Sequence, residues 1–227
     1  MSLALADPAS APDEAASRRM MIDTQLRTNG VNDPALLAAI ASVSRAAFVP
    51  AGAVALAYAD RAVPLTRARA LNPSLTTARL IGDAQVATGQ NILLIGAGAG
   101  YAAAVLSALG ARVTAVENDP ALLAMARTAL SGSAHVTLVD APLTAGAPDG
   151  APYDALIIDG AVESVPASLV SQLADGARIA AGIFDAGVTR LVRAVKMAGS
   201  DVVQPHAYAD LECVRLPGFS PPPTFTF

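Results

Sequence analysis

The residues best placed to do chemistry lie in and after the stretch ILLIGAGAGYAAAV, residues 92–105. An apolar run ends there at a glycine, and Gly96, Gly98 and Gly100 alternate with alanine before a helix of small residues. Glycine lets the backbone approach a ligand closely, and the helix that follows points its N-terminal amides at it. One glycine would be enough for a tight turn, so the three favour a ligand-binding loop.

Acidic residues end two of the strands that follow this loop. Glu117 ends the second predicted strand, about twenty residues on, where a carboxylate accepts hydrogen bonds from both hydroxyls of a ribose. Helix capping, the alternative role, is already filled by Asp119 before Pro120. Asp140 ends the third predicted strand, where it would meet an adenine amino group or serve as a solvated turn residue before Pro142.

The fourth predicted strand ends in Asp159, at the carboxyl edge where open α/β sheets bind ligands. The single cysteine, Cys213, rules out an internal disulfide framework and a Cys-rich zinc site, and we expect it to be a small apolar residue in a late strand. His135 and His206 have no carboxylate or serine placed beside them by a motif, so neither is a catalytic candidate. We expect no metal site.

The elements that must position these residues alternate along the chain. Short apolar strands are predicted at 91–95, 112–117, 135–140, 153–159 and 177–184, with helices at 101–110, 120–130 and 163–174 between them. This alternation favours an α/β fold with a doubly wound, mostly parallel sheet covered on both faces. Segments 189–198 and 201–216 have no crossover helix between them, so they should pair antiparallel at one edge.

The third glycine of the loop comes too early for the dinucleotide pattern G-x-G-x-x-G and is followed by Tyr101. ILLIGAGAGYAAAVLSALG resembles the signature VLEIGTGSGYxAAxLAxL of protein-L-isoaspartate (D-aspartate) O-methyltransferases, which are class I S-adenosylmethionine-dependent methyltransferases. VSRAAFVP, AYADRAVPL and APYDALIIDGAVESVPASL resemble further motifs of that family, in its order. The similarity covers roughly residues 20–196.

The resemblance implies a Rossmann-like fold with S-adenosyl-L-methionine as cofactor. Its binding residues would be Gly96, Gly98, Gly100, Tyr101, Glu117 and Asp140. The partner would be a protein or peptide that contains isoaspartyl residues, and the methyl ester formed on the isoaspartyl carboxyl would promote succinimide formation and so repair.

This chain departs from the family in the substrate loop, where GQTISQP falls on ARALNPS, residues 68–74. Asn72 falls on the serine near the transferred methyl, while Ala70 and Ser74 replace the threonine and the proline. Leu94 replaces the glutamate of LEIG, and Asp159 begins the DGA that replaces TAA. Asn72 and Asp159 are therefore the catalytic candidates, although Asn72 before Pro73 also suits a turn.

These substitutions leave the chemistry open. An isoaspartyl carboxyl is already an anion at neutral pH and needs no general base, so transfer depends on positioning and on exclusion of water. The Asn72 amide can donate a hydrogen bond as serine does. Asp159 would repel an anionic acceptor, or act as general base toward a neutral one.

Composition narrows the remaining alternatives. The chain has 227 residues, 53% hydrophobic, and a net charge of −4, which gives no phosphate-binding footprint, so we expect no nucleic-acid partner. The N-terminal residues do not resemble a signal peptide, and no apolar run is long enough to span a bilayer. We therefore expect a cytoplasmic protein with no membrane contact. The sequence does not predict its oligomeric state. A paralogue that only binds the cofactor, or acts on another acceptor, remains an alternative, and a nicotinamide-dependent reductase rests on the glycine loop alone.

The predicted domains are a disordered tail at 1–16, a helical and substrate-loop extension at 17–88, a Rossmann-like domain that binds the cofactor at 89–216 and a proline-rich tail at 217–227. Helices in the extension should end at Asn29-Gly30, begin at Asp33-Pro34 and run over 75–87. In the last tail, we expect Phe219, Phe225 and Phe227 to pack back on the body.

Overall fold

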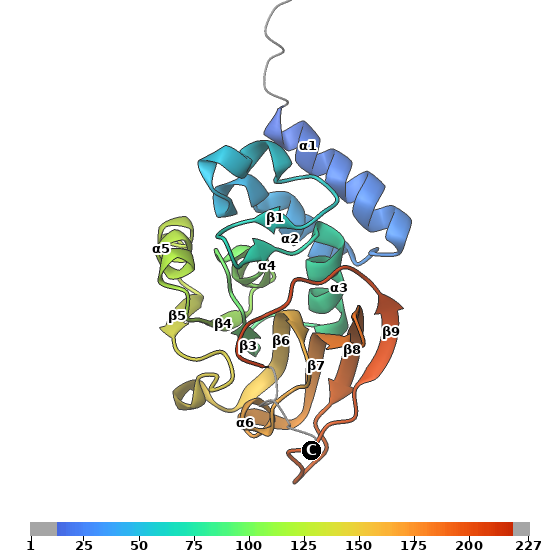
Figure 1. Cartoon of the computed structure of the whole chain (residues 1–227), viewed down its shortest axis with the longest axis vertical. Helices are drawn as coiled ribbons and strands as arrows, with labels where there is room; N and C mark the ends of the chain where they lie inside the picture. The colour runs from blue at the N-terminus through green and yellow to red at the C-terminus, as the bar shows by residue number, and fades with distance from the viewer. Residues whose placement is uncertain (1–12, 220–227) are drawn as a thin grey trace, which may run out of the picture.

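A computed structural model describes residues 13–219. The predicted disordered tail at 1–16 lies mostly outside these residues, but its last three residues are helical, so the boundary at 16 was wrong. Phe225 and Phe227 also lie outside the described residues, while Phe219 is buried as expected. An N-terminal helical group lies over one face and one end of a twisted sheet (Figure 1). Within the described residues no helix combines the length and hydropathy that crossing a bilayer requires.

Seven strands in this part of the chain form one sheet in the order β5-β4-β3-β6-β7-β8-β9. The strands are β3 (Asn91–Ile95), β4 (Arg112–Glu117), β5 (Val136–Asp140), β6 (Tyr153–Val162), β7 (Leu173–Asp185), β8 (Val188–Val195) and β9 (His206–Asp210). The first five are parallel, and β8 and β9 pair antiparallel at one edge, which confirms the predicted fold class. A separate two-stranded hairpin joins β1 (Val63–Pro64) to β2 (Ala70–Leu71).

The helices are α1 (Glu14–Met21), α2 (Pro34–Ser42), α3 (Ser74–Ala84), α4 (Tyr101–Ala108), α5 (Pro120–Ala129) and α6 (Ala167–Val170). Asp33 and Asp119 cap α2 and α5 with side-chain hydrogen bonds, and each is followed by a proline in the first turn, as predicted. The first helix continues through π and 3₁₀ turns to Asn29 and stops at Gly30 (φ +79°), the predicted end.

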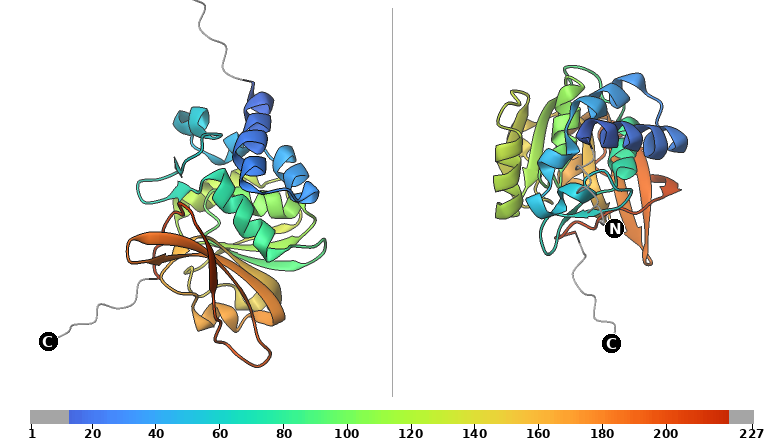
Figure 2. Two further views of the ribbon diagram at one scale, coloured as in Figure 1. Left: turned by 90° about the vertical axis from the view of Figure 1, so that its right-hand side faces the viewer. Right: turned by 90° about the horizontal axis from the view of Figure 1, so that it is seen from above.

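Two hydrophobic layers pack on the sheet. Buried residues of α2, α3, α4 and α5 form the larger core on one face, and the smaller core on the other face includes residues of α6 and Phe219. Figure 2, left, shows the larger group of helices on one side of the sheet and α6 on the other. Only four residues of the predicted helix at 163–174 are helical, because Pro166 prevents an earlier start and Leu173 already pairs with Tyr153 in the sheet. The second face is therefore covered mainly by loops.

Two other predicted elements end early. The third helix stops at Ala84, because Gln85 adopts a left-handed conformation (φ +46°). Of the predicted strand at 201–216, only β9 joins the sheet. After it, residues 212–216, which we call the C-terminal strap, cross back to the carboxyl end of β6, where Ala161 and Arg215 form a parallel bridge (Figure 1).

The order of the strands places the ligand-binding crevice. From β3 the chain winds outward through β4 and β5, and then returns to place β6 on the other side of β3. Open α/β sheets bind ligands outside the carboxyl ends of the strands at such a switch point. The glycine loop, residues 96–100, follows β3 at this point, and Glu117 ends the neighbouring β4.

The glycine loop tolerates little substitution at its last position. Gly100 has φ +102°, and a Cβ on it would lie 2.7 Å from Leu130 Cδ1. We expect Gly100→Ala to lower the free energy of unfolding by about 2 kcal/mol, through backbone strain and overpacking. Urea denaturation measures this loss. Gly132→Ala, where no atom lies within 4 Å of the added Cβ, should change stability much less; equal effects would contradict the packing argument.

Candidate active site

The glycine loop is buried and turns sharply at the carboxyl end of β3. Gly96, Gly98 and Gly100 all have positive φ angles, +76°, +56° and +102°, a backbone region that disfavours other residues. Tyr101 begins α4 directly after the loop. The structure thus brings these four predicted residues together with Glu117, because the Gly98 amide donates a 2.9 Å hydrogen bond to its carboxylate.

Glu117 is fully buried and its carboxylate is fully engaged. It accepts hydrogen bonds from the backbone amides of Gly98, Asn118 and Asp119 at 2.9, 3.0 and 3.1 Å. Both of its oxygens also bind the guanidinium of Arg69, each at 2.8 Å, in a two-pronged ion pair. Arg69 comes from the β1–β2 hairpin, and its side chain is 4% exposed. The two oxygens predicted to bind a ribose therefore hold an arginine of the same chain.

Backbone and side-chain contacts fix the C-terminal strap at the switch point. Ala161 donates to the Val214 carbonyl at 2.8 Å, and Leu216 donates to the Ala161 carbonyl at 2.9 Å. Arg215 pairs with Glu163 at 2.5 Å and lies over the ring of Phe184. The strap thus extends the carboxyl end of β6 as a short parallel pairing.

Leu216 fills the space between the glycine loop and the end of β6. A Cβ on Gly96 would lie 2.7 Å from its Cδ1, and a Cβ on Gly160 would lie 2.5 Å from its Cγ. Leu216 itself is buried. The crevice at the switch point is therefore occupied by a side chain from the end of the described chain.

Asn72 and Asp159, the two catalytic candidates, contact each other directly. The Asn72 amide donates to the backbone and side-chain oxygens of Asp159 at 3.0 and 2.9 Å, and its own oxygen accepts from the Val214 amide at 2.7 Å. Thr77 donates to the same carboxylate at 3.0 Å. Asn72 is 1% exposed and Asp159 8%. Both amide hydrogens of Asn72 are bonded within the protein, so neither is available to an acceptor in this structure. The catalytic roles of the two residues remain a prediction.

A buried arginine lies behind this pair. Arg45 donates from Nε to the Ala57 carbonyl at 2.7 Å and from its guanidinium to the Asn72 carbonyl. Its guanidinium also lies 4.7 Å from the ring centroid of Tyr101, which packs edge-on against Phe48. Burial lowers the pKa of Arg45 and raises that of Tyr101. Tyr101 therefore packs between the glycine loop and the N-terminal extension, in the hydrophobic core.

The other residues considered from the sequence are more peripheral. Asp140 is exposed and pairs in register with Glu117 across β4 and β5. Cys213 is buried in the strap, where burial raises the pKa of its thiol, and it does not lie in a strand as predicted. His206 is exposed at the start of β9.

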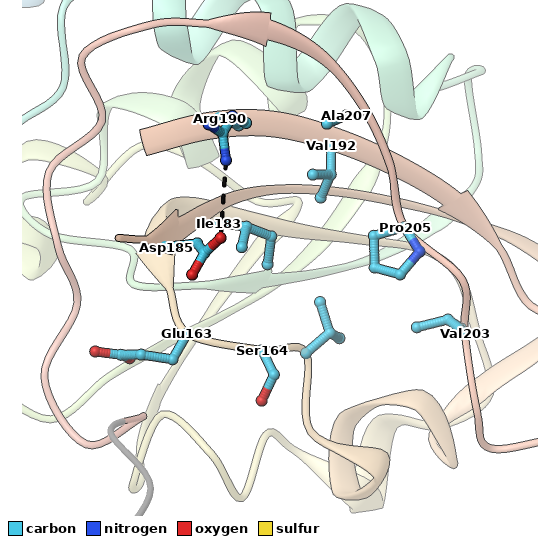
Figure 3. A pocket seen from close by; sticks show the side chains of 10 residues that line it. Glu163, Ser164, Ile183, Asp185, Arg190, Val192, Val203, Pro205 and Ala207 are labelled. Atoms are coloured by element: carbon cyan, nitrogen blue, oxygen red, sulfur yellow. Dashed lines mark ion pairs between the residues drawn. The ribbon is translucent and has the colours of Figure 1, made fainter. Parts of the chain in front are cut away.

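Two pockets flank the strap. One, of about 540 Å³, opens beside the cleft and is lined by Arg69, Leu216 and the start of α5. The other, of about 370 Å³, lies under β7 and β8; its apolar floor includes Ile183 and Val192, and its Arg190 pairs with Asp185 at 3.8 Å (Figure 3). The second pocket contains none of the predicted site residues.

S-adenosylmethionine, the cofactor of the fold class described below, has suitable backbone and carboxylate partners here, but two side chains of the chain itself lie against them. The glycine loop and Glu117 are of the kind that receives an aminoacyl tail and a ribose. However, Leu216 fills the crevice beside the loop, and Arg69 takes the acceptor positions of Glu117. Beside them lies the pocket of about 540 Å³.

The sheet with antiparallel end strands, together with the glycine loop and an acid ending the next strand, defines the Rossmann-like class of S-adenosylmethionine-dependent methyltransferases. Comparison with known proteins agrees. The family model "Protein-L-isoaspartate(D-aspartate) O-methyltransferase (PCMT)" matches residues 16–211. The chain therefore belongs to the protein-L-isoaspartate (D-aspartate) O-methyltransferase family.

Curated relatives and solved structures are similar over most of the chain. A protein-L-isoaspartate O-methyltransferase of Methylorubrum populi is 39% identical over 78% of this chain and 84% of its own. One from Rhodopseudomonas palustris is 37% identical over 90% and 84%. A solved protein-L-isoaspartate O-methyltransferase superposes with a TM-score of 0.77 at 20% identity, covering 89% of this chain and 66% of that one. A Plasmodium falciparum structure titled as a putative member in complex with S-adenosyl-L-homocysteine gives 0.72 at 15% identity, covering 88% and 97%.

Three residues that shape the site were not singled out from the sequence. Arg69 falls on the glutamine of the family's GQTISQP when Asn72 is set on its serine, so a charged residue in place of that uncharged one was the available signal. Arg45 stands in VSRAAFVP, one of the matching motifs. No feature of the sequence around Leu216 predicts its contact with the glycine loop.

Asp159 provides a test of the buried pair. Burial raises its pKa above the ordinary value of 3.8, so the folded chain binds the proton more tightly than the unfolded chain. Stability therefore falls as pH rises from the ordinary pKa through the raised one. Asp159→Asn keeps an oxygen that accepts from Asn72 and Thr77 but removes the charge.

We expect this variant to gain stability relative to the wild type between about pH 4 and about pH 8, by about 1.4 kcal/mol for each pH unit that separates the two pKa values of Asp159. Urea unfolding at both pH values measures the difference. A difference that does not change with pH would contradict the raised pKa.

Proposed function

We propose that this protein transfers a methyl group from S-adenosyl-L-methionine to the free carboxyl of isoaspartyl residues in damaged proteins. One observation supports the proposal above the others: the glycine loop and Glu117 come together at the switch point, joined by the Gly98 amide. Family membership over residues 16–211 agrees with it. S-adenosylmethionine supplies the electrophilic methyl group when it is bound.

The proposed roles of this chain's residues follow from their positions. Gly96, Gly98 and Gly100 would line the cofactor, with Tyr101 fixing the start of α4 behind them. Glu117 would bind the ribose, and Asp140 the adenine. No proton has to be removed from an ionised acceptor, so the acceptor site needs to orient a carboxylate and exclude water.

Asn72 and Asp159 are proposed to shape the acceptor side of the cleft. Asn72 would act by holding the Asp159 carboxyl and the strap rather than through a free amide hydrogen, because its amide is already bonded to both. The raised pKa of Asp159 favours its neutral form, which lessens repulsion of an anionic acceptor. The partner would be an isoaspartyl protein or peptide, met in the cytoplasm.

The test is methyl ester formation on a synthetic isoaspartyl peptide, with the same peptide carrying normal aspartate as control. We expect base-labile radioactive methyl ester on the isoaspartyl peptide alone, because a carboxyl displaced by one methylene group changes its alignment with the methyl donor. A known family enzyme serves as positive control. Equal labelling of both peptides, or none beside an active control, would contradict the proposed substrate.

Asp140 offers a separate test of cofactor binding, because it is exposed and makes no contact that the fold requires. Asp140→Asn should weaken S-adenosylhomocysteine binding about tenfold, the effect of losing one charged hydrogen-bond partner. Isothermal titration calorimetry measures this change, with Asp175→Asn, also exposed, as the matched control. An unchanged dissociation constant would remove Asp140 from the site.

A binding protein without methyl transfer is the second candidate. The observation in its favour is the saturation of Asn72, whose side chain has no remaining hydrogen to offer an acceptor. Tight cofactor binding with no transfer to isoaspartyl peptide or to small carboxylic acids would support it.

A further inference from the structure

We infer that this chain closes its own cofactor cleft: Arg69 and Leu216 occupy the positions that the ligand's ribose and aminoacyl tail would take, and both must withdraw before the ligand binds. The inference rests on the proposed cofactor and concerns how access to its site is controlled. Three observations about the cleft support it.

The first observation is the saturation of Glu117. Three backbone amides and both prongs of Arg69 surround its carboxylate, and both side chains are almost fully buried. A ribose can bind this carboxylate only by displacing Arg69, because the amides belong to the fixed turn after β4 and to the glycine loop. Glu117 remains paired with the three amides after the exchange, so displacement does not leave it without partners.

The second observation is the close packing of Leu216. Its side chain lies against the Cα atoms of Gly96 and Gly160, closer than an added Cβ on either would allow. Gly96, directly after β3, and Gly160, in β6, flank the switch point, where a ligand would lie. Because both glycines lack a side chain, they leave a space, and Leu216 fills it.

The third observation is that both residues lie outside the strands of the main sheet. Arg69 lies in the hairpin that joins the two-residue strands β1 and β2, and Leu216 in the strap that joins β6 by one isolated bridge. Both line the same pocket of about 540 Å³. Withdrawal of both side chains would join this pocket to the crevice.

Closure lowers the apparent affinity, because the ligand binds only the open fraction of molecules. Removing Arg69 should therefore tighten binding, the reverse of the usual result for a residue in a binding site. We expect Arg69→Ala to bind S-adenosylhomocysteine at least about tenfold more tightly than the wild type in isothermal titration calorimetry. Arg69→Gln, which keeps an amide donor near Glu117, covers the case in which the alanine variant does not fold.

Matched controls separate this effect from general loosening. Arg67→Ala removes an exposed arginine from the same hairpin loop and should leave affinity unchanged. Leu216→Ala should also tighten binding, whereas Leu169→Ala, which truncates a buried leucine of α6, should not. Hydrogen exchange gives a second readout: the Leu216 amide, now bonded to Ala161, should exchange faster when S-adenosylhomocysteine is bound.

Each outcome decides between the proposals. Wild-type binding as tight as that of both Arg69 variants overturns the inference and leaves the proposed function standing. Tighter binding by the variants without methyl transfer supports the inference and contradicts the function. No binding by any variant contradicts both. Tighter binding with unchanged protection at Leu216 overturns the part of the inference that concerns the strap.

Discussion

The hydrogen bonds of Asn72 join the three parts of the molecule that form the cleft. Its side chain links the end of β2 to Asp159 on β6 and to Val214 in the strap, and its carbonyl accepts from Arg45. Buried polar groups must find partners inside the protein, so the positions of these segments depend on one another. The substrate-loop residue that departs from the family motif is thus also a structural connection.

Closure by Arg69 has an energetic basis. Glu117 is buried without solvent, and a buried carboxylate that loses its charged partner costs about 3–5 kcal/mol. In a cleft without ligand, Arg69 and the three amides together offset that cost. The carboxylate that would bind a ribose is therefore destabilising when the cleft holds no ligand. In this chain Arg69 serves as its counter-ion in that state.

Local sequence predicted much of this molecule. The strand at 91–95, the turn of the glycine loop, the aspartate caps of α2 and α5 and the antiparallel edge all depend on residues close together in sequence or on simple alternation. The ion pair of Arg69 with Glu117 joins positions 48 apart, and the predicted last strand gave way to a strap because Asn72 and Ala161 offered its backbone other partners. Such contacts depend on the assembled fold, so neither the closed crevice nor the saturation of Asn72 could be predicted from the sequence.

The contact between Val214 and Asn72 also affects the order of folding. It joins residues 142 positions apart, and contacts of such long sequence separation carry a high loop-closure cost and form slowly. The sheet and the glycine loop are built from nearer contacts and can assemble first. The strap that carries Leu216 into the crevice is thus held by a contact that is costly in loop-closure entropy to form.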